Sequence, residues 1–148
     1  MLTNVNKGKY IISVVMENIV NKWGVVPYRE IVEGDLEFLI VSTKSGRWGL
    51  PKGNLMKKLG PKETARQEAF EEAGIIGTIV DRKISAKVNG KKIAFFPMEV
   101  KNEFSVWPES DWRKRKWIRS DETGNYLNHN ALKTLLKGVS EKILQSCS

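Results

Sequence analysis

Apolar side chains recur at every second position in parts of the chain, which is the period of a β-strand. From Leu36 onward this alternation predicts a strand over residues 36–42, and a strand over 24–29 is expected just before it. The glycine-containing turn at 33–35 separates the two segments. We therefore expect this pair to form a β-hairpin.

A second hairpin is expected around Asn89 and Gly90, because this dipeptide suits a tight turn between strands. Apolar stretches over 77–88 and 91–100 flank the turn and would supply the two strands. A further short strand is expected at 117–118.

Two other segments have apolar residues at helical spacing. Over residues 131–144 this spacing predicts a closing amphipathic helix. The segment before Trp23 is ambiguous, because residues 10–16 are rich in β-branched side chains that suit a strand, yet its apolar positions also fit a helix. Its structure stays open over residues 1–21. Apolar surface exposed by this segment would favour a homodimer, so the chain is either a monomer or a homodimer.

Residues 53–75 hold the most informative pattern, because three glutamates fall on one face of a predicted helix. Glu68 lies one helical turn before Glu71 and Glu72, so the three carboxylates converge. Like charges held this closely cost stability unless a cation neutralises them, and hard cations such as Mg²⁺ bind oxygen ligands. The segment therefore predicts a divalent-metal site.

The rest of this segment fits a short helix packed on a sheet. Pro61 suits the first helical turn, and Gly74 suits the C-terminal end. A stripe of small residues recurs at helical spacing and would let the helix lie close to a sheet. The stripe consists of Ala65, Ala69 and Ala73.

Length and composition favour one domain spanning residues 1–148, with 41% hydrophobic residues. No apolar run approaches the roughly 20 residues of a membrane span, and the single cysteine, Cys147, allows no internal disulfide. We therefore expect a cytoplasmic protein without membrane contact. His129 is the only histidine and is expected at the surface, so a zinc site or a cysteine–histidine hydrolase lacks ligands.

The formal net charge of +8 predicts polyanionic partners. Phosphorylated small molecules and RNA both satisfy this composition, so charge alone does not choose between them.

The segment 53–75 also resembles the signature of the Nudix hydrolases, G-x5-E-x7-R-E-U-x-E-E-x-G-U, where U is an aliphatic residue. The matching positions are Gly53, Glu68, Glu71, Glu72, Gly74 and Ile75. The departures are Leu59 for the first glutamate, Gln67 for the arginine and Ala69 for an aliphatic residue. In the family the arginine braces the carboxylates by an ion pair, which glutamine replaces only by neutral hydrogen bonding. Because the metal-holding glutamates are all present, we interpret this box as a working variant.

The resemblance implies an α/β (α+β) fold, the Nudix-type α/β/α sandwich with a mixed β-sheet, over most of residues 22–144. It also implies an enzyme that hydrolyses a phosphoanhydride bond with Mg²⁺, or with Mn²⁺ as the alternative metal.

The resemblance further assigns roles to the box residues. Glu68 and Glu72 would be direct metal ligands, and Glu71 a ligand or a general base, so that all three are catalytic. The backbone carbonyl of Lys52 or Gly53 would complete the metal shell.

A basic segment between two tryptophans, residues 112–117, carries four cations in succession. If it enters a strand, Arg113 and Arg115 share one face, and the planar arginine fork favours them as a phosphate-facing pair. Glu103 and Glu109 precede this segment and are further candidates for the general base.

This basic segment resembles the R-K-R-E-W sequence of the diphosphoinositol polyphosphate phosphohydrolases, a Nudix branch that also acts on diadenosine polyphosphates. Pro51-Lys52-Gly53 also occurs in diadenosine polyphosphate hydrolases, so both substrate classes stay open. On this resemblance the expected substrate-binding residues are Lys22, Arg29, Lys44, Arg47, Lys52, Arg113 and Arg115.

Three functions are therefore carried forward. The leading hypothesis is Mg²⁺-dependent hydrolysis of a diphosphoinositol polyphosphate or a diadenosine polyphosphate. Removal of pyrophosphate from RNA 5′ ends or from nucleoside triphosphates is a second enzymatic hypothesis. A catalytically weak module that binds polyphosphate or RNA is the third, and it is motivated by Leu59 and Gln67.

Overall fold

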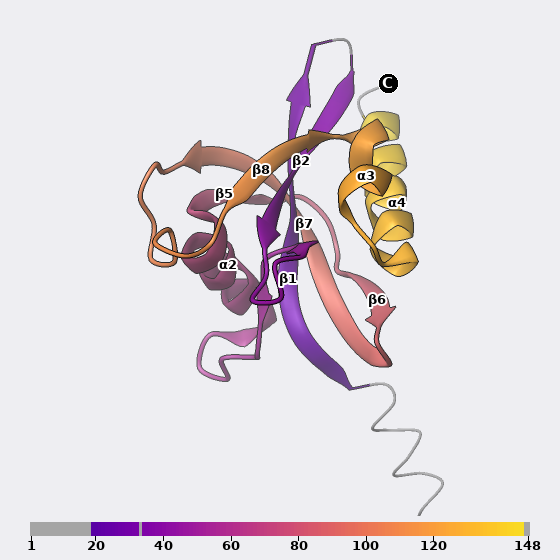
Figure 1. Cartoon of the computed structure of the whole chain (residues 1–148). Coiled ribbons are helices and arrows are strands. Elements are labelled where there is room, and N and C mark those ends of the chain that lie inside the picture. Colours follow the sequence, from indigo (N-terminus) through magenta and orange to yellow (C-terminus); the bar gives the residue numbers. More distant parts are fainter. Residues whose placement is uncertain (1–18, 33, 147–148) are drawn as a thin grey trace, which may run out of the picture.

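The computed structural model describes residues 19–32 and 34–146, which form one mixed β-sheet with helices on both faces (Figure 1). The strands are β1 (Val20–Ile31), β2 (Asp35–Ser42), β3 (Trp48–Gly49), β4 (Lys52–Gly53), β5 (Ile75–Ile79), β6 (Ile84–Val88), β7 (Lys91–Glu103) and β8 (Arg115–Arg119). The helices are α2 (Gly60–Ala73), the 3-10 helix η1 (Ser120–Glu122), α3 (Thr123–Tyr126) and α4 (Asn130–Ser146).

The order of strands places β1 at the centre of the sheet. The main path runs β3-β2-β1-β7-β5, while β4 pairs with β1, β6 with β7 and β8 with β2. The β1–β7 pair is parallel and the other pairs are antiparallel. The predicted mixed sheet is therefore confirmed.

Two apolar clusters hold the helices against opposite faces of the sheet. On one face, the alanine stripe of α2 is completely buried against a cluster that includes Val25 and Leu39. On the other face, α4 buries Leu135 and Leu136 in the cluster of Val26 and Tyr28. Because successive residues of a strand point to opposite faces, neighbouring residues of β1 serve different clusters. The predicted α/β/α sandwich is confirmed.

The first predicted hairpin is present, although its strands are longer than the alternation indicated. β1 extends the predicted strand 24–29 at both ends, and it pairs antiparallel with β2. The predicted helix over 131–144 lies within α4, and the short strand at 117–118 lies within β8. Of the open N-terminal segment, Val20 and Asn21 begin β1, while residues 1–18 and Cys147 lie outside the described residues.

The second predicted hairpin also forms, and its turn has the expected geometry. Asn89 and Gly90 have φ values of 52° and 77°, the two positive angles that a tight two-residue hairpin turn requires. β6 and β7 pair antiparallel on either side of it.

The single strand predicted over 77–88 is wrong, because the segment is divided into β5 and β6 along the same edge of β7. The four residues 80–83 span only Phe96 and Pro97 of the partner strand. Pro97 has no N–H group to donate, and its carbonyl accepts the amide of Val80 at 3.1 Å. The extra residues therefore bulge out of the sheet. In the described part of the chain, no helix has the length and apolar character to cross a membrane.

We expect opposite effects from alanine at Gly90 and at Gly138. Gly90 has a φ of 77°, so Gly90→Ala should lower the free energy of unfolding by about 1 kcal/mol. Gly138 lies inside α4, where an added Cβ meets nothing within 4 Å, so Gly138→Ala should raise it by about 0.5–1 kcal/mol. Urea unfolding measures both changes. Equal effects of the two substitutions would contradict the turn geometry.

Candidate active site

The box helix α2 is fixed at both ends and on one face, which aims its carboxylates at β4. Pro61 occupies the first turn, and Gly74 ends the helix at a left-handed φ of 64°. The alanine stripe presses the helix onto the sheet. Glu68 and Glu72, one turn apart on another face, consequently lie beside the two residues of β4.

Gly53 of β4 leaves the space that Glu68 occupies. A Cβ at this position would stand 2.2 Å from the Cδ atom of Glu68, far inside van der Waals contact. Any larger residue at Gly53 would push the carboxylate out of its place. The first glycine of the box is thus explained by the close approach of backbone and carboxylate.

Glu68 and Glu72 form a partly buried carboxylate pair. Burial, followed by the hydrogen bond that the protonated Glu72 donates to Glu68, raises the pKa of Glu72 to about 8. Burial also raises the pKa of Glu68, with further contributions from Glu71 and Glu109. The pair therefore holds a proton at neutral pH in the absence of a cation.

This pair fits a hard divalent cation in its chemistry, since its donors are oxygens and a cation would replace the shared proton. Glu71 points elsewhere, because its Oε1 accepts a hydrogen bond from Gln67 Nε2 at 3.0 Å. Within residues 19–32 and 34–146, no three acidic, histidine or cysteine side chains are gathered as a metal cluster. The assignment of Glu68, Glu71, Glu72 and Gly53 as metal ligands stays a prediction.

Gln67, which occupies the arginine position of the Nudix box, makes the kind of contact that the sequence predicted. It binds Glu71 through a neutral hydrogen bond one turn along the helix. The charged group beside the carboxylates is Arg113, which comes from the loop before β8.

Arg113 is the cation that faces the carboxylates. Its Nη1 lies 3.8 Å from Glu72 Oε1, and its Nε and Nη2 donate to Glu109 Oε1 at 2.9 and 2.7 Å. Nη1 also donates to the Ser42 carbonyl at 2.6 Å, and the guanidinium lies over the Trp112 ring. Protein groups thus engage the whole guanidinium, so Arg113 pairs with Glu109 while its charge also faces Glu72. Its predicted contact with substrate stays untested.

The loop of residues 104–114, together with Arg115, closes the C-terminal end of α2. The last carbonyls of a helix have no partner within it, so something else must satisfy them. Four successive carbonyls, those of residues 71–74, accept donors from this part of the chain. The bonds run from Glu109 N to Glu71 O at 3.2 Å, Trp107 Nε1 to Glu72 O at 3.0 Å, Arg115 Nη1 to Ala73 O at 2.7 Å and Phe104 N to Gly74 O at 2.8 Å.

Arg115 therefore has a structural role that the sequence did not reveal. Besides its bond to Ala73, it lies 3.4 Å from Glu103 and 4.0 Å from the centroid of the Trp107 ring. A cation at a helix C-terminus is also favoured by the helix dipole. These contacts hold Arg115 against the protein, and its predicted role in substrate binding stays untested.

A cavity of about 320 Å³ reaches Lys52, the β4 residue beside Glu72, although none of the three box glutamates lines it. Lys52 connects the cavity to Glu72, since its side chain lines the cavity while its backbone amide lies 3.4 Å from Glu72 Oε1. Burial lowers the pKa of Lys52, and the nearby Glu72 carboxylate opposes that shift. Lys22 and Arg47 line the same cavity, so three of the predicted substrate-binding residues come together there.

Two further basic residues line this cavity that were not predicted to do so. Lys91 follows the turn of the second hairpin, and His129 precedes α4. His129 is half-buried and lines the cavity, because the fold brings the start of α4 to it. The order of residues along the chain gave no signal for this approach.

Four of the seven predicted substrate-binding residues do not line this cavity, namely Arg113 and Arg115, described above, and Arg29 and Lys44. Arg29 pairs with Glu37 at 2.8 Å and lies over the Trp117 ring. Lys44 is exposed and is absent from the cavity lining.

The fold and the box helix define a Nudix-type α/β/α sandwich, and comparison with known proteins agrees. Nudix hydrolase 18, mitochondrial, from Arabidopsis thaliana is 34% identical over 113 residues, which are 67% of this chain and 64% of that protein. Nudix hydrolase 21, chloroplastic, from the same plant is 29% identical over 133 residues, with 83% and 67% coverage. This chain belongs to the Nudix hydrolase family. It spans about two thirds of the length of these relatives.

Solved structures show the same fold. A crystal structure of an Ap4A hydrolase binary complex from C. elegans superposes with a TM-score of 0.71 at 22% identity, covering 83% of this chain and 98% of that one. A Nudix hydrolase from M. smegmatis, RenU, gives a TM-score of 0.60 at 14% identity, covering 85% and 87%. No protein-family model matches the chain.

We expect Arg113→Gln to lower the free energy of unfolding by about 2 kcal/mol, because it removes the charged hydrogen bonds to Glu109 and to the Ser42 carbonyl. Arg113→Lys is the matched control, which keeps the charge but loses the fork, and its cost should be smaller. Urea unfolding without added metal measures both. A cost below about 1 kcal/mol for the glutamine variant would show that the bridge contributes little.

Proposed function

We propose that this protein hydrolyses a phosphoanhydride bond in a highly anionic substrate, with Mg²⁺ as the cofactor. The observation that carries the proposal is the buried Glu68–Glu72 pair, which meets a cavity lined by basic residues at Lys52. Carboxylates to hold a cation and cations to hold phosphates are thus adjacent. Family membership supports hydrolysis of this general kind.

Each group of residues has a task in the reaction. Lys22, Arg47 and Lys52 would bind phosphate oxygens and orient the anhydride beside the carboxylate pair. Glu68 and Glu72 would hold the metal ion, which when bound neutralises phosphate charge and lowers the pKa of a coordinated water. Arg113 keeps Glu72 and Glu109 in place. Glu71, Glu103 and Glu109 remain the candidates for the general base.

The substrate class is proposed from the charge and size of the cavity. Five basic side chains around about 320 Å³ suit a chain of phosphates more than a large apolar group. The similar fold of an Ap4A hydrolase supports a dinucleoside polyphosphate, and the basic segment supports a diphosphoinositol polyphosphate. RNA with a 5′ triphosphate and nucleoside triphosphates present the same phosphates and are the alternatives.

We expect Glu72→Gln to reduce turnover about a thousandfold or more, because the amide cannot hold a metal as the carboxylate does. Product release with Mg²⁺ should be measured for diadenosine polyphosphates, diphosphoinositol polyphosphates, nucleoside triphosphates and 5′-triphosphorylated RNA. Folding should survive, since Glu72 is protonated at neutral pH without metal and glutamine is its neutral counterpart of the same shape. Absence of turnover by the parent on every substrate, with binding retained, would favour a polyphosphate-binding module instead.

We expect charge reversal in the cavity to raise KM about tenfold or more for each residue changed, because a cation that binds phosphate is replaced by an anion. Lys22→Glu and Arg47→Glu are the test variants, since both residues line the cavity. Lys44→Glu is the matched control, because it makes the same change outside the cavity lining. Equal KM values for Lys44→Glu and Lys22→Glu would contradict the assignment of this cavity.

A further inference from the structure

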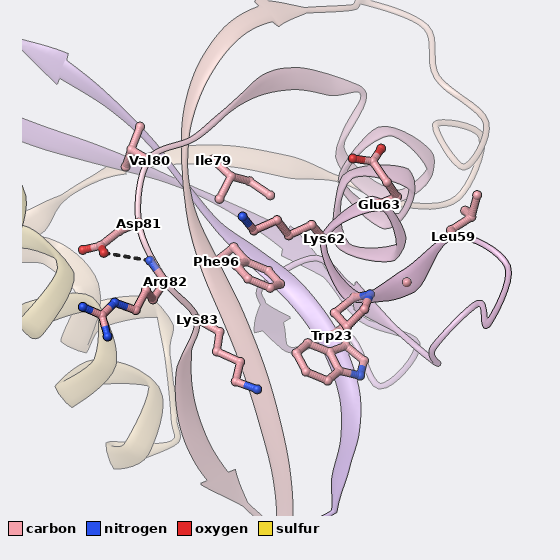
Figure 2. A pocket seen from close by; sticks show the side chains of 12 residues that line it. Trp23, Leu59, Lys62, Glu63, Ile79, Val80, Asp81, Arg82, Lys83 and Phe96 are labelled. Atoms are coloured by element: carbon pink, nitrogen blue, oxygen red, sulfur yellow. Dashed lines mark hydrogen bonds between the residues drawn. The ribbon is translucent and has the colours of Figure 1, made fainter.

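A second, larger cavity of about 940 Å³ lies beside the first turn of α2 (Figure 2). Its walls are the start of α2 on one side and the bulge of residues 79–83 on the other. No residue lines both cavities, and the three box glutamates line neither of them. The second cavity is therefore separate from the proposed hydrolytic site.

The period of the strands explains why the two cavities open on opposite faces of the sheet. In β1, Lys22 lines the first cavity and the next residue, Trp23, lines the second. In β7, Phe95 and Phe96 are divided in the same way. The bulge of residues 79–83 then supplies the outer wall, which a continuous strand would not provide.

The floor of the second cavity is aromatic. The rings of Trp23 and Phe96 stack with centroids 6.1 Å apart and planes 18° from parallel. Only 8% and 4% of these two residues is exposed, so the core holds the rings in place and they offer the cavity a narrow strip of surface, not an open ring face. Ile79 extends this apolar floor.

Two lysines give the cavity a positive side. Figure 2 shows Lys62 reaching across the cavity above Phe96, while Lys83 lies beside Trp23, with its Nζ 4.9 Å from the ring centroid. Lys62 has no salt bridge within the residues that the structure describes.

The acidic residues around the cavity are already neutralised by partners. Glu63 pairs with Arg66, and Asp81 pairs with Lys142 at 2.7 Å. Neither Arg66 nor Lys142 lines the cavity, so the charges that remain for a ligand are positive. A ligand that fits these surroundings carries an anionic group and a flat apolar body.

Leu59 also favours an anionic ligand in the second cavity. It lies on the rim, is 45% exposed and occupies the position where the Nudix box has its first glutamate. A carboxylate there would repel an anion in the cavity, and leucine removes that repulsion. One departure from the family pattern thus coincides with the cavity.

We propose that the second cavity binds a nucleoside monophosphate, with the base between the exposed side chains of Leu59 and Val80, over the edges of the Trp23 and Phe96 rings, and the phosphate between Lys62 and Lys83. Binding needs no metal and no residue of the hydrolytic site. A volume of about 940 Å³ falls within the range of small-molecule sites and leaves room for base, sugar and phosphate.

The first test is isothermal titration of the full chain with AMP in the presence of EDTA, so that metal-dependent binding is absent. Adenosine and ribose 5-phosphate serve as the two halves of the ligand. We expect AMP to bind at least about tenfold more tightly than either half, because the floor and the lysines act together. No binding of AMP, or binding of ribose 5-phosphate as tight as that of AMP, would overturn the proposal.

Charge variants then locate the site. Lys62→Glu, Lys83→Glu and Leu59→Glu should each weaken AMP binding about tenfold. Lys137→Glu changes an exposed residue of α4, away from both cavities, and should leave the affinity unaltered.

Lys22→Glu distinguishes the two cavities. It should leave metal-free AMP binding intact, whereas a loss comparable to that of Lys62→Glu would place the AMP in the first cavity and refute this assignment. Since the hydrolysis assays use other ligands, Mg²⁺ and other variants, either proposal can fail without the other.

Discussion

The arrangement of the site depends on holding two like-charged carboxylates together away from bulk water. Burial and mutual contact raise the pKa of Glu72 to about 8, so the pair is unfavourable unless a proton, an arginine or a metal ion offsets it. The residues around the pair make room for the two carboxylates or offset their charge. Gly53 makes room for Glu68, the amide of Lys52 points at Glu72, and Arg113 provides the nearest guanidinium. The stability that α2 gains by packing its alanines on the sheet sustains the strained arrangement.

The alternation of side chains along β1 and β7 gives the sheet a second purpose beyond the core. The same two strands send charged and aromatic residues into separate cavities on opposite faces, although the positions are adjacent in sequence. The proposed phosphate-binding cation of one cavity and part of the floor of the other therefore come from one dipeptide, Lys22-Trp23. The bulge opposite Pro97 then forms one wall of the second cavity.

The sequence predicted what depends on local periodicity and left unpredicted what depends on contacts between distant segments. The helix α2, the two hairpins and the closing helix follow from spacing, glycine and proline, so their prediction was correct. The break between β5 and β6 was missed because it is caused by Pro97, a residue of the partner strand. That Arg113 and Arg115 share one face stays a prediction, since Arg113 lies before β8, and their acceptors Ser42 and Ala73 lie on β2 and α2, 71 and 42 residues away. His129 reaches the first cavity for the same reason.

Four hydrogen bonds from residues 104–115 to the carbonyls of residues 71–74 fix the loop to the C-terminal end of α2. The spacing of these carbonyls is fixed by the helix, so an insertion or deletion in the loop would move its donors away from them. Such a change would cost stability that an insertion in an unattached surface loop would not. The unit that could be exchanged between relatives is consequently the helix together with its loop, and not the loop alone. Changes in substrate preference are then easier to obtain at the turn between β2 and β3, where Ser45 and Arg47 line the first cavity without securing the helix.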